Sequence, residues 1–257
     1  MNSPLNTAQP PSVIVVIPAY RASLTPHERI SLQQCVTMLG HYPLTVVKPE
    51  GLDLSGWLAD FPTLQFDSFA DAYFTSIAGY NELLCSELFY ERFLAYDYML
   101  ICQLDAFILR DTLADWCRRG YDYIGAPQFA DVRPVRDEPE TLRTRVSKVF
   151  QRPLFNGGLS LRRVRACLRL LRSYHRFHGR WPGNEDGFFS LHYPRLIPYR
   201  HLIRSPKPDE ALHFAIELEP ARSLALNDGQ LPMGCHAWDK YDLDFWRPIL
   251  RQFGHEV

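Results

Sequence analysis

Two short apolar stretches constrain the fold of this chain more than any other feature of its sequence. They are Val13–Ile17 and Tyr98–Cys102, and the first ends at a proline while the second ends in Gln103-Leu-Asp105. Runs of this length and character are typical of strands that are buried on both faces of a parallel sheet. We therefore expect both stretches to be interior strands of one sheet.

The segments around these runs alternate between helical spacing of apolar residues and further short strands. Predicted helices run from Pro26 to Leu39, around Trp57, from Ser76 to Phe93, Thr112 to Arg119, Pro139 to Phe150, Val164 to Phe177 and Pro208 to Leu218. Predicted strands are Leu44–Val47, Leu64–Phe66, Tyr121–Ile124 and Gly157–Leu161, and the chain from Leu231 onward is expected to be irregular. This order predicts an α/β fold with a mostly parallel central sheet flanked by helices.

The composition is ordinary for a soluble globular protein, and the length fits one large α/β domain as well as two small ones. The chain has 257 residues, of which 46% are hydrophobic and 22% charged, and these values exclude a disordered or coiled-coil protein. We expect a flexible tail over residues 1–12 and one domain over residues 13–257. No stretch has the length of a transmembrane helix, and the first residues lack the basic start of a signal peptide. The six scattered cysteines predict reduced, buried thiols of a cytoplasmic protein.

The net charge of −1 hides a strongly basic segment. Residues 141–184 contain eleven Lys and Arg residues and no Asp or Glu. Such a segment indicates either a surface that faces an anionic partner or a solvated helix face balanced by acidic neighbours in the fold.

Two motifs place polar groups or glycines beside predicted strands. Loops that follow strands are where ligands bind in α/β sheets. Asp105 lies in Gln103-Leu-Asp-Ala-Phe107, where a carboxylate can hold Mg²⁺ or Mn²⁺ on phosphates or can cap a turn. Asn156-Gly157-Gly158 opens another strand, and its two glycines favour close approach to a ligand or a tight turn.

Two further motifs carry titratable side chains. Glu185 and Asp186 follow a Pro-Gly turn, and such a pair can bind a hydroxyl group and take its proton. The alternative is that both acids begin a helix behind an N-cap at Asn184. His236 lies between Gly234 and Trp238, where it is either a metal or diphosphate ligand or a structural histidine.

In this order the motifs resemble those of the GT-A glycosyltransferases. The resemblance is strongest to a bacterial family with a similar run of motifs over Val13 to Trp246. The matching segments are Gln103–Phe107, Gly120–Pro127, Asn156–Arg162, Asn184–Asp186 and Gly234–Trp238. The resemblance implies a GT-A-like (Rossmann-like) fold and transfer of a sugar from a nucleotide-sugar donor.

The resemblance also implies roles for single residues. Donor binding falls to Pro18, Ala19, Tyr20, Gln103, Asp105 and Lys240. The sugar and acceptor side falls to Asn156, Gly157, Gly158 and Trp238. Asp105 and His236 would hold Mn²⁺ or Mg²⁺. Asp186 would be the general base of an inverting reaction, and Glu185 would orient the acceptor.

One departure from the family pattern concerns the metal. GT-A enzymes usually carry Asp-x-Asp after the middle strand, whereas here Gln103 stands two residues before Asp105. Gln103 can still offer a carbonyl oxygen. Alternatively, a basic side chain such as Lys240 or Arg162 neutralises the leaving diphosphate without a metal.

Two other functions stay open at this point. The incomplete Asp-x-Asp fits a sugar-nucleotide-binding module without turnover, and the basic segment fits a polyanion binder. The chain contains no recognised nucleic-acid-binding motif, so no nucleic acid is expected as a partner. For the leading function we expect a glycan, a lipid-linked or another anionic acceptor, which the segment Arg143–Arg152 guides. Peripheral contact with a membrane is compatible with such an acceptor.

Overall fold

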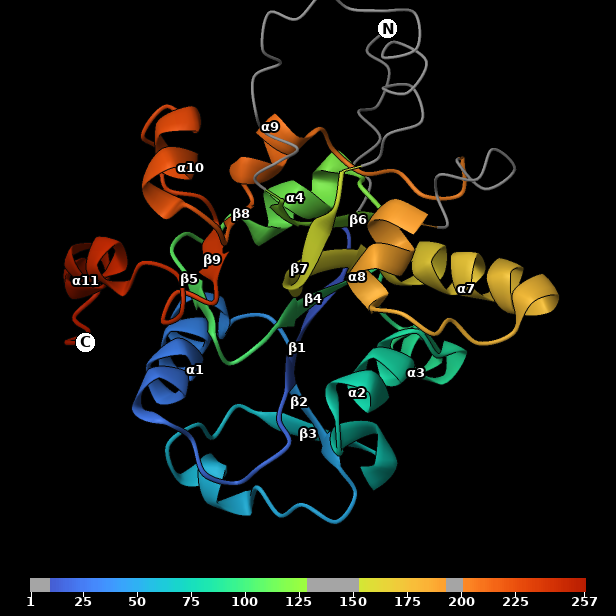
Figure 1. The fold of residues 1–257 in the computed structure, drawn as a ribbon. Coiled ribbons are helices and arrows are strands. Elements are labelled where there is room, and N and C mark those ends of the chain that lie inside the picture. Colours follow the sequence, from blue (N-terminus) through green and yellow to red (C-terminus); the bar gives the residue numbers. More distant parts are fainter. Residues whose placement is uncertain (1–9, 129–152, 193–200) are drawn as a thin grey trace, which may run out of the picture.

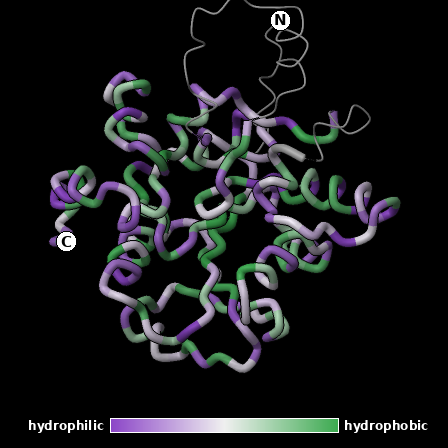
Figure 2. The backbone as a smooth tube through the Cα atoms, viewed as in Figure 1, coloured by the Kyte–Doolittle hydropathy of each residue, from purple (hydrophilic) through white to green (hydrophobic). Residues whose placement is uncertain are grey.

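The central feature of the computed structural model is a six-stranded sheet in the order β3-β2-β1-β4-β7-β6. The structure describes residues 10–128, 153–192 and 201–257. The strands are β1 (Val13–Pro18), β2 (Leu44–Pro49), β3 (Gln65–Phe69), β4 (Tyr98–Cys102), β6 (Tyr123–Pro127) and β7 (Phe155–Arg163). Figure 1 shows this sheet in the middle of the molecule, and Figure 2 shows that its central strands are mainly hydrophobic.

Both apolar runs are interior strands, as the sequence predicts. β1 pairs in parallel with β2 on one side and with β4 on the other, and Val16 lies opposite Ile101. β2 and β3 are also parallel, whereas β7 is antiparallel to both of its neighbours. The sheet is therefore mostly parallel, and the α/β prediction is confirmed.

Helices cover both faces of this sheet. In Figure 1, α1 lies on one side, whereas α2, α3 and α7 lie on the other. A capping box begins α1, because the Thr25 hydroxyl accepts a hydrogen bond from the Glu28 backbone and the Glu28 carboxylate accepts one from the Thr25 backbone. The helices are α1 (Pro26–Leu39), α2 (Ile77–Leu84), α3 (Glu87–Arg92), α4 (Leu113–Arg119), α7 (Val164–His178), α8 (Glu185–Gly187), α9 (Pro208–Leu212), α10 (Pro220–Leu226) and α11 (Leu243–Gln252). Shorter helical turns are η1 (Ser55–Ala59), η2 (Asp71–Phe74) and η3 (Phe188–His192).

The helix predicted from Ser76 to Phe93 is two helices. It breaks between α2 and α3, because Ser86 caps a new helix by accepting a hydrogen bond from the backbone of Phe89. Leu84 and Phe89 are nevertheless both buried, so the apolar spacing runs through the break. The pattern alone therefore could not show where one helix ends.

The last third of the chain corrects two further predictions. The helix predicted from Pro208 to Leu218 ends at Leu212, and the chain continues as β8 (Ala215–Ile216). The region expected to be irregular contains β9 (Gly234–His236) and α11. β9 is the central strand of a small second sheet in the order β5-β9-β8, with β5 at Ala106–Ile108. Strands this short show no alternation in sequence, and only their long-range pairing creates them.

Some predictions fall outside the described residues. The helix from Pro139 to Phe150 is one of them, and most of the tail is another. All six cysteines are free and buried, as predicted. Within the described ranges, no helix combines the length and the apolar character that crossing a membrane requires.

Candidate active site

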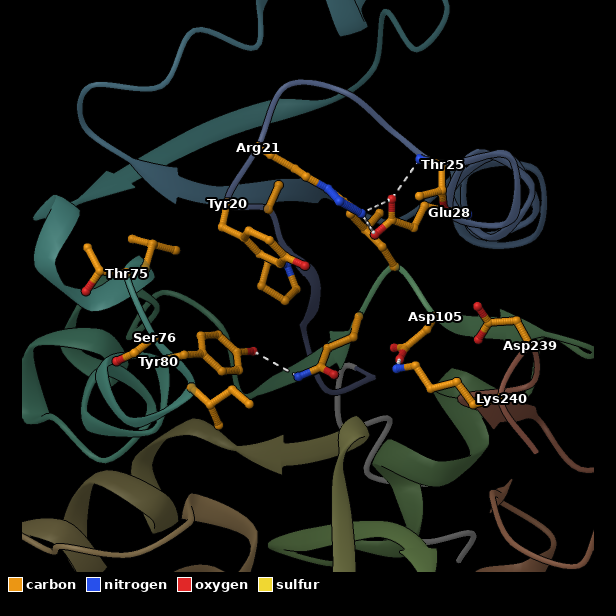
Figure 3. Close-up of a pocket in the computed structure, with 16 residues that line it drawn as sticks. Tyr20, Arg21, Thr25, Glu28, Thr75, Ser76, Tyr80, Asp105, Asp239 and Lys240 are labelled. Carbon is orange, nitrogen blue, oxygen red and sulfur yellow. Dashed lines mark hydrogen bonds and ion pairs between the residues drawn. The ribbon is translucent and has the colours of Figure 1, made fainter.

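A pocket of about 700 Å³ opens where the loops after β1 and β4 meet (Figure 3). Because these strands are parallel neighbours, their carboxyl ends lie at the same edge of the sheet. The pocket wall includes every residue that the sequence assigns to the donor, namely Pro18, Ala19, Tyr20, Gln103, Asp105 and Lys240. Residues as far apart in the sequence as Pro18 and Lys240 thus line one cavity.

One end of the pocket has an exposed apolar rim. The Tyr20 ring is 62% exposed, and Ile77 at the start of α2 is 81% exposed. Arg21 and Glu28 line the pocket as well, and an Arg21 Nη2 atom lies 2.5 Å from Glu28 Oε1. Flat aromatic and apolar side chains next to hydrogen-bonding groups are typical of ligand sites. Arg21, Glu28 and Ile77 were not predicted, because nothing in the local sequence sets them apart from ordinary surface residues.

The other end of the pocket carries the Asp105 carboxylate between two cationic side chains. Lys240 Nζ lies 2.6 Å from Asp105 Oδ2, and His236 Nε2 lies 3.1 Å from Asp105 Oδ1. Burial alone would raise the pKa of Asp105, but the hydrogen bonds and charges of His236 and Lys240 outweigh it and lower that pKa. Asp105 is therefore an anion held by two cations.

The small second sheet places His236 between two carboxylates. His236 lies opposite Ala106 of β5, which directly follows Asp105. On the other side, β8 pairs in parallel with β9, and Glu217 is the residue after β8. The Glu217 Oε1 atom lies 3.0 Å from His236 Nδ1. Burial alone would lower the pKa of His236, but its bonds to Asp105 and Glu217 raise it to about 9, so the ring is an imidazolium at neutral pH.

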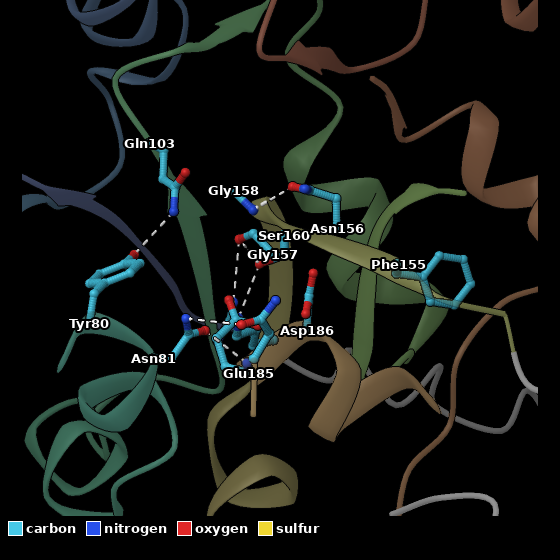
Figure 4. Close-up of polar contacts among 12 residues, drawn as sticks. Tyr80, Asn81, Gln103, Phe155, Asn156, Gly157, Gly158, Ser160, Glu185 and Asp186 are labelled. Carbon is cyan, nitrogen blue, oxygen red and sulfur yellow. Dashed lines mark hydrogen bonds and ion pairs between the residues drawn. The ribbon is translucent and has the colours of Figure 1, made fainter. Parts of the chain in front are cut away.

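The two glycines of the Asn156-Gly-Gly motif leave space for two site side chains. A Cβ atom on Gly158 would lie 2.0 Å from His236 Nε2, and one on Gly157 would lie 2.0 Å from Glu185 Oε1. Neither glycine has a positive φ angle, so close packing and not backbone conformation requires them. Asn156 accepts a hydrogen bond from the Gly158 backbone at 2.6 Å (Figure 4). Its side-chain amide donates one to Glu217 at 3.0 Å.

Glu185 forms a buried ion pair with Arg162. Arg162 has no exposed surface, and its Nη2 atom lies 2.8 Å from Glu185 Oε1. The guanidinium also donates to Ser160, to the Tyr90 hydroxyl and to the Gly157 carbonyl oxygen. Burial raises the pKa of Glu185, against the opposing effect of the Arg162 charge. The alternative that Arg162 neutralises a diphosphate is therefore wrong, because its charge is enclosed and already paired.

Asp186 is half-buried and follows Glu185 in the three-residue helix α8. The sequence offered Asn184 as a side-chain cap for this helix, but Asn184 makes no such bond. Instead, Asn81 of α2 accepts a hydrogen bond from the Glu185 backbone at 2.9 Å. The cap thus comes from a distant helix. Asp186 is not among the described residues that line the pocket, and Figure 4 shows it close to Glu185 at the Asn156 side of β7.

Trp238 is a correction to the predicted acceptor site. Its side chain is fully buried, and its indole N–H donates to Ser31 Oγ at 2.9 Å. It packs in a second core cluster with Phe107 and Trp246. The aromatic side chain next to His236 thus supports the second sheet from within and has no surface for a sugar.

The described site brings few metal-binding side chains together. Among the described residues, no group of three or more His, Cys, Asp and Glu side chains converges on a metal position. Glu217 contacts Nδ1 of His236, on the opposite side of the ring from Asp105. His236 Nε2 does lie close to two possible oxygen ligands. The Asp105 carboxylate is 3.1 Å away and the Gln103 side-chain carbonyl oxygen is 3.3 Å away. Two or three such ligands suit a cation that substrate phosphates also bind.

Several cations of the basic segment are balanced by acids where the structure describes it. Arg172 contacts both Glu87 and Glu91 of α3, Arg163 contacts Asp122, and Arg180 contacts Glu82. For this part, the interpretation as a balanced helix face is favoured over an anion-binding surface. Four further cations of the segment, Arg143, Arg145, Lys148 and Arg152, lie outside the described residues.

Solved structures with a similar fold are glycosyltransferases. The galactosyltransferase LgtC, solved in complex with donor and acceptor sugar analogues, matches with a TM-score of 0.52 and 12% identity over 87% of this chain and 86% of its own. The glycosyltransferase GlyE from Streptococcus pneumoniae TIGR4 matches with a TM-score of 0.49 and 12% identity. That match covers 95% of this chain, which spans 63% of the GlyE chain. The match to LgtC shows that the chain has the GT-A fold.

A search of curated protein sequences gives no match. A family model does match residues 63–236, which include β4, the Asn156-Gly-Gly motif, Glu185, Asp186, Glu217 and His236. This match covers more than half of the chain. The protein belongs to the family described as "Protein of unknown function (DUF5672)".

Proposed function

We propose that this protein is a glycosyltransferase that moves a sugar from a nucleotide-sugar donor to an acceptor hydroxyl group. The observation that carries the proposal is the pocket at the carboxyl ends of β1 and β4, with Asp105, His236 and Lys240 at one end. The GT-A fold supports it, since the LgtC structure with the same fold holds donor and acceptor analogues.

The pocket offers different chemistry to the two ends of a donor. The exposed Tyr20 ring and Ile77 suit the flat base, because aromatic and apolar surfaces bind it without strict geometry. Lys240 is 61% exposed and lies at the opposite end beside Asp105. We place the diphosphate there, where Lys240 and the His236 imidazolium supply positive charge.

A divalent cation fits the same end. Asp105, the Gln103 carbonyl oxygen and His236 would hold it, in keeping with the oxygen and imidazole ligands that Mn²⁺ accepts. His236 would release its Nε2 proton on binding the cation, because only the neutral ring nitrogen is a metal ligand. It would supply additional positive charge against the leaving nucleoside diphosphate. Lys240 can supply part of this charge by itself, so we expect the cation to increase the rate without being its only source.

The proposed chemistry is an inverting displacement with Asp186 as general base. The Asp186 carboxylate takes the proton of the acceptor hydroxyl while the acceptor oxygen bonds to the anomeric carbon. The bond from that carbon to the diphosphate oxygen breaks, and its electrons leave with the nucleoside diphosphate. Buried Phe188 and Phe189 follow Asp186, and the adjacent Glu185–Arg162 pair fixes the start of α8. Both features favour a carboxylate held in a defined place.

The acceptor is proposed to bind at the start of β7. Asn156, Gly157 and Gly158 lie between the Asp105–His236 pair and Glu185, because the two glycines touch His236 and Glu185 directly. An acceptor there would reach Asp186 on one side and the donor on the other. A glycan, lipid-linked or other anionic acceptor remains our proposal for its class.

The test is a binding screen of nucleotide-sugars by thermal shift and calorimetry, with and without Mn²⁺. We expect stabilisation by at least one donor in the wild-type protein and weaker binding in Asp105→Ala. Unchanged affinity of Asp105→Ala for every donor that binds would contradict the proposed site.

A second candidate is a nucleotide-sugar-binding module without turnover. The single carboxylate after β4, already paired with two cations, favours it. The same screen, followed by a measurement of donor hydrolysis and transfer, separates the two. Tight donor binding without any released nucleoside diphosphate supports the module.

A further inference from the structure

Glu217 joins two parts of the candidate site that are far apart in the sequence. Its Oε1 atom accepts from the Asn156 side-chain amide at 3.0 Å and from His236 Nδ1 at 3.0 Å. The carboxylate is about nine-tenths buried, and a buried charge is costly unless it is paired and hydrogen-bonded. Both partners belong to the motifs that the sequence singles out. Glu217 itself carried no assigned role.

The small sheet determines which atom of His236 faces the pocket. Because β8 and β9 are parallel in register, Glu217 lies beside His236 and binds Nδ1. Nε2 is thereby left on the side of Asp105 and Gln103. A carboxylate that binds one nitrogen of an imidazole ring fixes the orientation of the ring. It also makes the other ring nitrogen a better ligand.

The same carboxylate also holds the start of β7. Asn156 accepts from the Gly158 backbone, and Gly158 is the residue against which the His236 ring packs. His236, Glu217, Asn156 and Gly158 therefore form a closed set of contacts. Removing Glu217 frees the ring and the Asn156 side chain together.

We propose that Glu217 is a positioning residue that aims His236 at the donor diphosphate and ties it to the Asn156-Gly-Gly strand. The inference rests on the proposed function for what His236 binds, but the contact itself does not depend on it. Loss of such a supporting carboxylate typically weakens metal binding or activity about 10–100-fold. We expect a loss of this size for Glu217→Ala.

Replacement by glutamine separates geometry from charge. A glutamine carbonyl oxygen can accept two hydrogen bonds, so Glu217→Gln keeps the arrangement of His236 and Asn156. We expect it to retain most of the affinity that Glu217→Ala loses. The matched control is Glu219→Gln, because Glu219 lies two residues away, is half exposed and pairs with Arg222 outside the site.

The first experiment examines His236 in the ligand-free protein by ¹⁵N NMR of the histidine rings. The hydrogen-bonded Nδ1 proton of His236 is expected as a protected low-field signal, assigned by its loss in His236→Ala. It should persist in Glu217→Gln and Glu219→Gln and disappear in Glu217→Ala. An unchanged signal in Glu217→Ala overturns the proposal, whatever the protein binds.

The second experiment measures binding of Mn²⁺, alone and with UDP or GDP, by electron paramagnetic resonance. Affinity lower by about 10–100-fold in Glu217→Ala, with near-normal affinity in Glu217→Gln, supports the positioning role. Equal affinity of Glu217→Ala and wild type, at a melting temperature matching the control, overturns it. If the wild-type protein binds none of these probes, the proposed function fails, and the NMR result alone decides the role of Glu217.

Discussion

Replacing Gly158 by alanine tests the packing on which the donor end of the site depends. The new Cβ atom would lie 2.0 Å from His236 Nε2, and ordinary contact begins near 3.4 Å, so the ring must retreat by about 1.4 Å. A hydrogen bond of 3.1 Å, such as that of His236 Nε2 to Asp105, does not survive a shift of that size. We therefore expect His236 to lose Asp105, which keeps its pair with Lys240, and to stay paired with Glu217 on the far side of the ring.

The expected cost in stability is modest. Overpacking costs about 1–3 kcal/mol, and a Gly→Ala change recovers about 0.4–1 kcal/mol by restricting the unfolded chain. A net loss of about 1–2 kcal/mol lowers the melting temperature of a chain of this size by roughly 2–8 °C. The functional loss should be larger, since donor or Mn²⁺ affinity should fall about 10–100-fold.

Two other glycines provide matched controls for this experiment. Gly56→Ala places its Cβ in open space and should change neither stability nor binding. Gly157→Ala pushes instead on Glu185 and breaks its buried pair with Arg162, which typically costs about 3–5 kcal/mol. We expect the folded fraction of this variant to keep the contacts of His236.

Urea unfolding gives the stabilities, and calorimetry with the best donor from the screen gives the affinities. The reasoning is refuted if Gly158→Ala binds donor and Mn²⁺ as tightly as Gly56→Ala does. It is also refuted if Gly157→Ala and Gly158→Ala lose affinity equally without a difference in stability.

Three further substitutions have defined expected outcomes. Asp186→Asn should lower turnover roughly 10²–10⁴-fold with donor affinity and melting temperature unchanged, and near-normal turnover in a stopped assay would remove its role as general base. Lys240→Met should raise the donor Michaelis constant about fivefold to tenfold, because an exposed charge pair contributes about 1 kcal/mol to binding. An unchanged constant would place the diphosphate elsewhere. Trp238→Phe, which loses the bond to Ser31, should cost about 1–3 kcal/mol in urea unfolding without changing donor affinity, and a selective loss of affinity would return Trp238 to the site.

The central sheet and the pocket at the ends of β1 and β4 are predictable from the sequence because their signals are local. Val13–Ile17 and Tyr98–Cys102 are apolar throughout, and such runs have few alternatives to a buried strand. Loops that follow neighbouring parallel strands must meet. The positions of Tyr20 and Asp105 in one pocket follow from that geometry.

The interior contacts of the site are not predictable, because they depend on pairing between distant segments. Glu217 contacts His236 across 19 residues and Asn156 across 61, next to a strand of two residues. The one available signal is a single acid in the apolar stretch Phe214-Ala-Ile-Glu217-Leu, since a lone charge there requires a partner.

Trp238 shows the opposite error. A tryptophan beside a candidate ligand suggests a sugar-stacking surface, but the sequence does not reveal that a later part of the chain covers Trp238, which lies two residues after β9. Helix α11 and the loop before it complete a second core, in which Trp238 and Trp246 are both buried. The burial of Trp238 thus depends on a helix in a region that was predicted to be irregular.

The most direct test of the central claim measures nucleoside diphosphate released from a panel of nucleotide-sugars, with wild-type protein and Asp105→Ala side by side. If the pocket is a donor site for glycosyl transfer, the wild-type protein releases nucleoside diphosphate from at least one donor, faster with Mn²⁺, and an added acceptor increases the rate. Asp105→Ala should be strongly impaired with the same donor, while its melting temperature stays near that of the wild type. Release that is equal in the two proteins, or absent with every donor and acceptor in the panel, would contradict the claim.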